Sequence, residues 1–144
     1  MRDTTVVIKT IGRSTLKNAV WSAQREGFKV VVVSDGMDVP NSNLDVSYYK
    51  LGRTFKHYGS MAQNVGALLV ETEFVTYVDD DDELAEGAGD VIKKCLLKRP
   101  DVDIWIPGLR FNTGHVQCLA GPVAVSNVAI PTYRVDIFTK VPFK

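Results

Sequence analysis

The chain has 144 residues, a length that fits one domain with a buried core. Lysine plus arginine and aspartate plus glutamate number 17 each, so no net charge draws the chain to nucleic acid or to an anionic membrane. Cys95 and Cys118 have neither metal-binding nor redox spacing, and two cysteines make no disulfide framework. Without a signal peptide or an apolar run as long as a membrane span, the sequence predicts a soluble cytoplasmic domain.

Strands and helices alternate along the first two thirds of the chain. Runs of β-branched and apolar residues predict strands over 4–10, 28–34, 44–50, 74–78 and 102–106. Helical spacing of apolar residues predicts helices over 13–26, from Gly59 onward, and between Ala88 and Pro100. The expected buried faces of the last two helices contain Met61, Val65, Leu68 and Leu69, and Ala88, Val91, Ile92, Cys95 and Leu96. This alternation predicts an α/β fold with an open, mostly parallel sheet flanked by helices.

The pattern changes after Ile106. Residues 108–130 contain glycine and proline among short β-type runs, which predicts a small antiparallel extension. Residues 133–141 are predicted to form a last short helix. The sequence therefore predicts a single domain over 1–144, with a larger part over 1–107 and a smaller extension over 108–144.

Four consecutive aspartates, 79–82, follow the expected strand Phe74-Val75-Thr76-Tyr77-Val78. Adjacent carboxylates repel one another at neutral pH, so this crowding at a strand end indicates a nearby cation. Such oxygen ligands suit Mg²⁺ or Mn²⁺, ions that usually accompany a phosphate-bearing ligand. The alternative is a solvated acidic turn that caps the next helix.

Two other strand ends carry polar or flexible residues, namely Thr10-Ile11-Gly12-Arg13 and Ser34-Asp35-Gly36. Each of them alone is typical of a helix cap or a turn. Ligands of open α/β sheets bind beyond the carboxyl ends of the strands. Three polar strand ends together therefore predict a crevice with a base-reading carboxylate, a loop that approaches phosphate and a metal site.

These segments resemble the family 2 glycosyltransferases of the GT-A fold. Where that family has a strand ending in Pro-Thr with a nearby Arg, the chain has Val6-Val7-Ile8-Lys9-Thr10-Ile11-Gly12-Arg13. The family's Asp-Asp-Gly-Ser, Ala-Arg-Asn and Leu-Asp-x-Asp-Asp segments are matched by Ser34-Asp35-Gly36-Met37, Ala62-Gln63-Asn64 and Val78-Asp79-Asp80-Asp81-Asp82. Order and spacing agree over residues 4–84. The resemblance implies a Rossmann-like GT-A domain in a shortened form, with a donor-binding half over 1–107 and a reduced acceptor side over 108–144.

The resemblance also implies which residues bind the nucleotide. Asp35 would accept a hydrogen bond from the imide of a uracil-type base, which favours a UDP-sugar donor such as UDP-glucose. Thr10, Gly12 and Arg13 would lie along the base, the ribose or the pyrophosphate, and Asn64 would shape the pocket near the ribose and phosphates.

The aspartates divide into different implied roles. Asp79 and Asp81 form the Asp-x-Asp pair that would hold Mn²⁺ or Mg²⁺, with Asp81 the direct ligand and Asp79 nearer the ribose and sugar. Asp80 is a further donor-binding candidate, but neighbours on an extended backbone point in opposite directions, so its alternative role is an exposed carboxylate. Asp82 is expected to cap the following helix.

Three positions depart from the family pattern. Lys9 replaces a proline, Ser34 replaces an aspartate, and Gln63 replaces an arginine that would touch phosphate. Without that arginine, more of the diphosphate charge falls to the metal. His115 is a candidate metal ligand, because some GT-A enzymes use a downstream histidine, and its alternative role is a solvated turn residue.

The general base is not identified by the resemblance. In the family, a stretch like residues 130–143 precedes a Glu-Asp pair that deprotonates the acceptor, and the chain ends at Lys144 before such a pair. Asp103 and Asp136 are the candidates in its place, with surface positions as their alternative. Slow donor hydrolysis is therefore expected, while the sugar, the acceptor and the choice between inversion and retention stay open.

Two other functional classes stay open. One is a non-catalytic nucleotide-sugar-binding protein or a remnant of the enzyme. The other is a Mg²⁺-dependent phosphohydrolase or nucleotidyltransferase, which the absence of a Gly-rich Walker loop disfavours. Apolar residues near Val123 and Phe138 need a covering surface, which makes a homodimer a candidate assembly.

Overall fold

The computed structural model describes residues 3–39, 44–99, 101, 104–105, 109–110, 113, 116–117 and 132–134. Its centre is an open sheet with the strand order β3-β2-β1-β4-β8-β5. The four parallel strands are β1 (Thr4–Thr10), β2 (Lys29–Ser34), β3 (Ser47–Lys50) and β4 (Phe74–Asp79). Strand β8 (Thr132–Arg134) runs antiparallel to β4 and to β5 (Ile104–Trp105), and β6 (Leu109–Arg110) pairs separately with β7 (Val116–Gln117).

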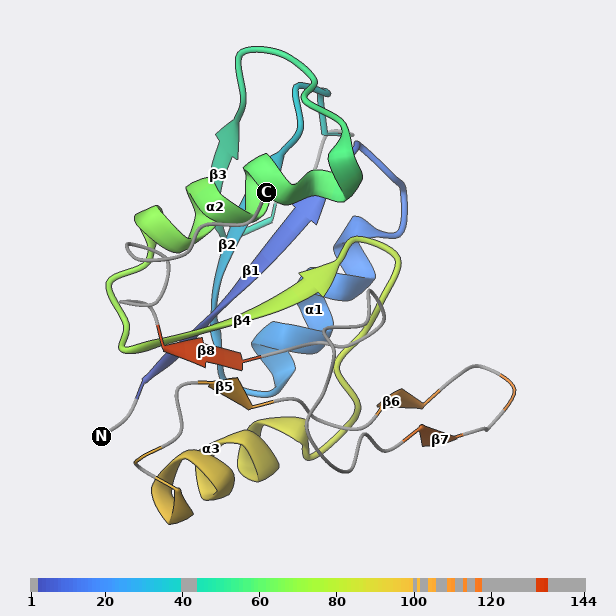
Figure 1. Ribbon diagram of the computed structural model, residues 1–144. Coiled ribbons are helices and arrows are strands. Elements are labelled where there is room, and N and C mark those ends of the chain that lie inside the picture. Colours follow the sequence, from blue (N-terminus) through green and yellow to red (C-terminus); the bar gives the residue numbers. More distant parts are fainter. Residues whose placement is uncertain are drawn as a thin grey trace.

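Helices cover both faces of this sheet (Figure 1). The helices are α1 (Leu16–Arg25), α2 (Ser60–Leu69) and α3 (Ala88–Lys98), and a short 3₁₀ turn, η1 (His57–Gly59), precedes α2. Helices α1 and α3 lie on one face and α2 lies on the other (Figure 1). The predicted α/β architecture with a mostly parallel sheet is confirmed.

The central strands are buried on both faces. Val6 and Ile8 of β1 pack in one apolar cluster with residues of α1 and α3, and Val7 packs in a second cluster on the α2 side. All three side chains are fully buried. Continuous apolar runs are typical of parallel strands covered on both sides, which is why these strands could be predicted from the sequence.

Helix α2 matches its predicted face only in part, because Val65 and Leu69 are half-buried and pack against the second apolar cluster. Leu68 is 72% exposed and Met61 is 39% exposed, whereas Ala62, Gly66 and Ala67 are buried. A Cβ atom on Gly66 would overlap a methyl group of Val7. Small residues therefore let the helix backbone approach β1 closely, and this close approach outweighs the larger apolar side chains in setting the rotation of the helix.

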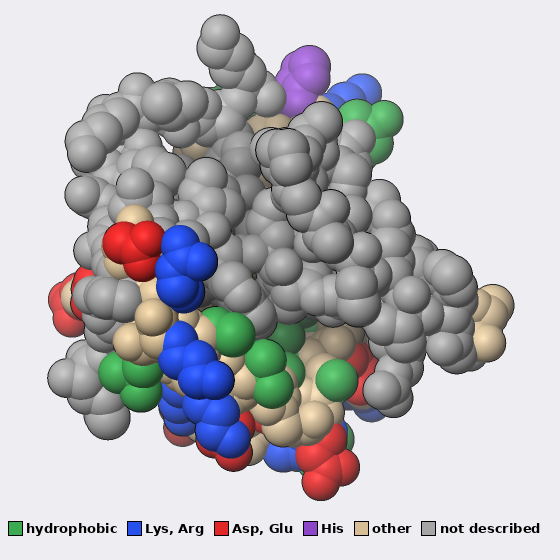
Figure 2. All heavy atoms as spheres, turned by 60° about the horizontal axis from the view of Figure 1, so that its bottom comes forward, with side chains coloured by type: hydrophobic (Ala, Val, Ile, Leu, Met, Phe, Trp, Pro, Cys, Tyr) green, Lys and Arg blue, Asp and Glu red, His purple; other side chains and the backbone are tan. Residues whose placement is uncertain are grey.

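Helix α3 matches its predicted face in part. Ile92 and Leu96 are buried and Cys95 is half-buried, but Val91 is 52% exposed. Figure 2 shows the side of the molecule that carries α3, where lysine and arginine side chains lie beside acidic and apolar ones.

The end of the chain departs from its prediction at Tyr133, which lies in β8 and not at the start of a helix. Strand pairing with β4 and β5 satisfies the backbone of this segment. Residues 135–141, and most of the predicted antiparallel extension over 108–144, lie outside the described residues. In the described part of the chain, no helix has both the length and the apolar character needed to cross a bilayer.

Candidate functional site

A cavity of about 430 Å³ opens at the carboxyl ends of the central strands. Strand register brings these ends together, because Thr10 pairs with Ser34 and Lys9 pairs with Asp79. The walls come from three strand ends and from the segment before α2: Lys9, Thr10, Ile11, Arg13, Asp35, Lys56, His57, Tyr58, Gly59, Asp79 and Asp80. The polar strand ends singled out in the sequence therefore do meet in one hollow.

Asp80 is the buried connection between β1 and β4. Its carboxylate accepts hydrogen bonds from the Thr10 hydroxyl at 2.6 Å, from the Ile11 amide at 3.1 Å and from the Arg13 guanidinium at 2.7 Å. The residue is only 2% exposed. The expectation of an exposed carboxylate is thus wrong, because the chain turns after Asp79 and directs Asp80 inward against the end of β1.

Arg13 partly neutralises the acidic turn. The same Nη1 atom that contacts Asp80 lies 3.1 Å from Asp81 Oδ2. The hydrogen bond with Asp80 is the main cause that raises the pKa of Arg13, and Asp81 and Asp79 add to it. The Arg13 guanidinium is thus already paired with two carboxylates of this turn.

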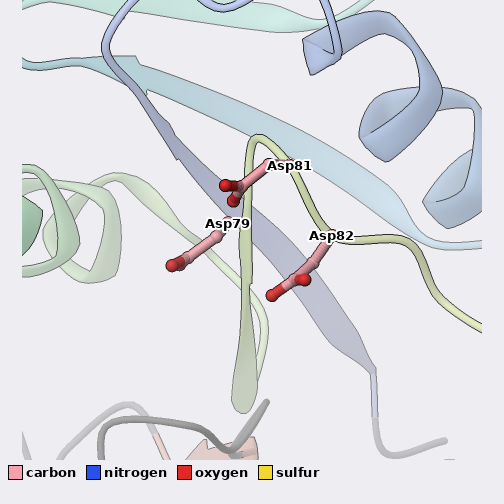
Figure 3. Close-up of side chains that lie close together, drawn as sticks. All are labelled: Asp79, Asp81 and Asp82. Atoms are coloured by element: carbon pink, nitrogen blue, oxygen red, sulfur yellow. The ribbon is translucent and has the colours of Figure 1, made fainter. Parts of the chain in front are cut away.

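The other three aspartates gather their carboxylates at the end of β4 (Figure 3). One oxygen from each of Asp79, Asp81 and Asp82 lies within 4.8 Å of the others. Desolvation is the main cause that raises the pKa of Asp82, followed by the charges of Asp79 and Asp81. Negative charge thus accumulates here despite Arg13, and an all-oxygen donor set of this size fits Mg²⁺ or Mn²⁺.

The role expected for Asp82 as a helix cap is wrong. Helix α3 begins at Ala88 with Gly87 as its N-cap, well beyond the acidic turn. The cap comes from Glu26, whose carboxylate accepts hydrogen bonds from the Gly87 and Gly89 amides at 3.2 and 2.9 Å. These bonds, with that of Gly89 first, lower the pKa of Glu26. No local capping pattern identifies Glu26, because it lies at the end of α1.

Helix α1 also fixes the segment that follows the aspartates. The Ser22 hydroxyl accepts a hydrogen bond from the Leu84 amide at 3.0 Å, and Arg25 donates one to the Leu84 carbonyl at 2.8 Å. Leu84 itself is buried in the core. The acidic turn is therefore held at both ends, by β4 before it and by α1 after it.

Asp35 holds the loop that forms the far wall of the cavity. Its two carboxylate oxygens accept hydrogen bonds from the Phe55 and Lys56 amides at 2.8 and 2.9 Å, and the residue is 2% exposed. Gly36, with φ of 78°, lies against the same loop, where a Cβ atom would overlap the carbonyl carbon of Arg53. Asp35 lines the cavity, where a base-reading residue was expected, and its carboxylate also holds the loop at Phe55 and Lys56 in place.

The wall that Asp35 holds is strained. Lys56, His57 and Tyr58 have φ values of 61°, 51° and 55°, a region that non-glycine residues seldom occupy. Tyr58 is 91% exposed, so its own side-chain packing does not explain this conformation. Strained backbone of this kind concentrates at ligand-binding sites. The sequence gives little signal for it, because none of the three residues is a glycine and only His57 is of a type that adopts positive φ more readily.

Lys9 connects the strained wall to the acidic turn. Its ammonium donates a hydrogen bond to the Tyr58 carbonyl at 2.6 Å and lies 3.2 Å from Asp79 Oδ1. The side chain is 17% exposed. The sequence marks Lys9 only as a departure from a proline, and its place on the cavity wall emerges from the fold.

The remaining site candidates divide into three groups. Gly12 adopts φ of 87° and its amide donates to the Thr10 hydroxyl at 2.9 Å, which shapes the turn after β1. Asn64 is half-buried on α2 and is not part of the cavity wall. Asp103, His115 and Asp136 lie outside the described residues.

The fold is shared with solved structures. Residues 1–349 of TarS from S. aureus match with a TM-score of 0.75 and 16% identity over 96% of this chain. TarS is a glycosyltransferase of the GT-A fold. This chain has that fold. TarS 1–349 in complex with UDP matches with a TM-score of 0.71, and the complex with UDP-GlcNAc matches with 0.69.

The match covers nearly all of this chain but less than half of each of these solved structures. The chain spans 48% of TarS 1–349, and it spans 42% of the bifunctional IspDF from Campylobacter jejuni, which matches with a TM-score of 0.60 and 14% identity over 96% of this chain. No protein-family model and no curated protein matches the chain. The GT-A architecture implied by the sequence resemblance is confirmed at the level of the fold.

Proposed function

We propose that this chain binds the nucleotide-sugar donor of a metal-dependent glycosyltransferase, with a UDP-sugar such as UDP-glucose as the donor. The cavity carries the proposal, because it gathers Thr10, Arg13 and Asp35 beside the acidic cluster of Asp79, Asp81 and Asp82. The TarS complexes with UDP and UDP-GlcNAc support a uridine nucleotide in this fold.

Asp35 is the proposed reader of the base. A carboxylate offers about four acceptor positions, and the Phe55 and Lys56 amides take two of them. The remaining positions suit the imide N–H of uracil. The edges of adenine and guanine present their donors and acceptors differently, and a mismatched buried polar group is costly. UDP should therefore bind more tightly than ADP or GDP.

The acidic cluster is the proposed metal site, with Asp81 as the main ligand, Asp79 beside it and Asp82 as the third carboxylate. A bound Mg²⁺ or Mn²⁺ would offset the charge of the departing diphosphate. Other residues of the protein support the site without contacting the metal. Arg13 pairs with Asp81 of the cluster and with Asp80, and the Asp80 network fixes Thr10 and the end of β1 at the cavity. This network fixes the polar groups before a ligand arrives.

Calorimetric titration of UDP, ADP and GDP, in Mn²⁺ and in EDTA, tests the binding proposal. UDP should bind most tightly, and Asp81→Ala should remove most of the gain that Mn²⁺ provides. Glu83→Ala is the matched control, because Glu83 is an exposed carboxylate outside the cluster. Equal losses for Asp81→Ala and Glu83→Ala, or tighter binding of GDP, would contradict the assigned site.

A turnover assay with UDP-glucose separates an enzyme from a non-catalytic binder. We expect slow release of UDP with water as the acceptor, and loss of the general base should slow this release further by about 10²–10⁴-fold. Asp103→Asn and Asp136→Asn test the two candidates for that base, and His115→Ala tests the candidate metal ligand. Tight UDP-glucose binding without any turnover would favour the non-catalytic binder.

A further inference from the structure

The Lys9 ammonium forms part of the cavity wall, and the proposed function assigns it no contact with the bound nucleotide. Its side chain is 17% exposed, and its ammonium has contacts to the Tyr58 carbonyl and to Asp79 Oδ1 at 2.6 and 3.2 Å. An ammonium has three N–H donors, so one donor remains for a ligand.

We propose that Lys9 contacts the diphosphate of the bound nucleotide. The inference rests on the proposed nucleotide-binding function. It assigns to one residue of β1 a role in binding the anionic part of the ligand, independent of the metal.

The other cations near the cavity are less suited to this role. The Arg13 guanidinium is already paired with Asp80 and Asp81. Lys56 is exposed on the strained turn, where water screens its charge. Gln63 is half-buried on α2, outside the cavity wall, and its carbonyl accepts the Tyr77 hydroxyl at 3.1 Å. Lys9, in contrast, extends from a buried strand and is held between two fixed acceptors.

The charge of Lys9 matters because Asp79 lines the same cavity. A diphosphate that enters beside an unpaired carboxylate is repelled, and the nearby ammonium offsets this repulsion. UDP should therefore retain measurable affinity over uridine when the metal is removed. The aliphatic part of Lys9 also passes close to Gly59, where a Cβ atom would lie 2.6 Å from Lys9 Cδ. Glycine at this position leaves room for the lysine to reach the cavity.

The test compares uridine, UMP and UDP by calorimetry in EDTA, with the wild-type chain and with Lys9→Met and Lys9→Arg. Lys9→Met should weaken UDP binding about tenfold or more, the usual effect of losing a charge-assisted hydrogen bond. Uridine binding should change less than about twofold, because uridine carries no phosphate. Lys9→Arg should recover part of the UDP affinity. The control is Lys29→Met, since Lys29 is an exposed lysine at the opposite end of β2.

An Asp79→Asn background distinguishes a phosphate contact from simple neutralisation of Asp79. If Lys9 contacts the diphosphate, Lys9→Met still weakens UDP binding in this background. If Lys9 acts only by neutralising Asp79, the additional loss disappears and the proposal is overturned. Thermal melts of every variant establish that the fold is retained.

The outcomes also separate this proposal from the one on which it rests. A wild-type chain that binds neither uridine nor UDP overturns the nucleotide-binding function, and the role of Lys9 with it. A wild-type chain that binds UDP, with Lys9→Met binding it equally well, overturns the role of Lys9 alone. Equal losses of uridine and UDP in Lys9→Met also overturn it, because such a loss is not specific to phosphate.

Discussion

Removal of the Asp80 carboxylate should destabilise the fold, although it also removes one charge from a crowded acidic run. The two effects oppose each other. Like-charge relief at a partly exposed turn is worth at most about 1 kcal/mol. The buried hydrogen bond from Thr10 at 2.6 Å and the partly buried one from Ile11 at 3.1 Å have an ionised acceptor, and such bonds contribute about 1.5–3 kcal/mol each.

The loss of these hydrogen bonds should outweigh the relief of charge repulsion. Arg13 adds little, because its side chain is 46% exposed and solvent screens the pair. Asp80→Ala also leaves the buried Thr10 hydroxyl without its acceptor. We expect a net loss of about 3 kcal/mol in the free energy of unfolding, a large part of the 5–15 kcal/mol typical of a domain. Asp80→Asn should cost less, because it retains one acceptor oxygen.

Urea denaturation at pH 7 in EDTA, followed by circular dichroism, measures this difference. The matched control is Asp81→Ala, because the Asp81 side chain is 51% exposed and its contact is with Arg13. That variant should change the free energy of unfolding by less than about 1 kcal/mol. An Asp80→Ala variant as stable as the wild type would refute the reasoning, since charge repulsion would then outweigh the buried network.

Two further predictions concern the framework around the site. Glu26→Gln should destabilise the protein by about 1 kcal/mol at pH 7, because Glu26 caps α3. The pKa of Glu26 is lowered in the folded state. The stability that its carboxylate contributes is therefore present above the unfolded pKa of about 4.3, and it is lost as the pH falls through the folded pKa. The difference in stability between the two proteins should therefore shrink in urea titrations as the pH falls below about 4.3, and a constant difference would contradict the cap. Gly66→Ala should cost about 1–3 kcal/mol by overpacking against Val7, whereas Gly52→Ala, with open space around it, should have little effect. Equal melting temperatures for these two alanine variants would exclude the close approach of α2 to β1.

The sequence by itself determined the four parallel strands and the general position of the site. The valines of β2 and the apolar residues of β1 and β4 are buried on both faces, so their patterns depend little on which neighbour covers them. In a parallel sheet, all strands end at one edge, and so the polar residues after β1, β2 and β4 had to come together. These features follow from local patterns and from one topological rule.

Only the tertiary structure decided how individual polar groups are used. Asp80 and Thr10 are 70 positions apart in the chain, and Lys9 and Tyr58 are 49 positions apart, so no local pattern links either pair. The face of α2 was likewise set by the backbone contact at Gly66, which the apolar periodicity of the helix does not record. A carboxylate or an ammonium in an extended segment has no fixed role until packing supplies its partner and excludes water. The sequence therefore located the acidic turn, and the fold determined that Asp80 is a structural anchor while Asp79, Asp81 and Asp82 share the surface where a cation fits.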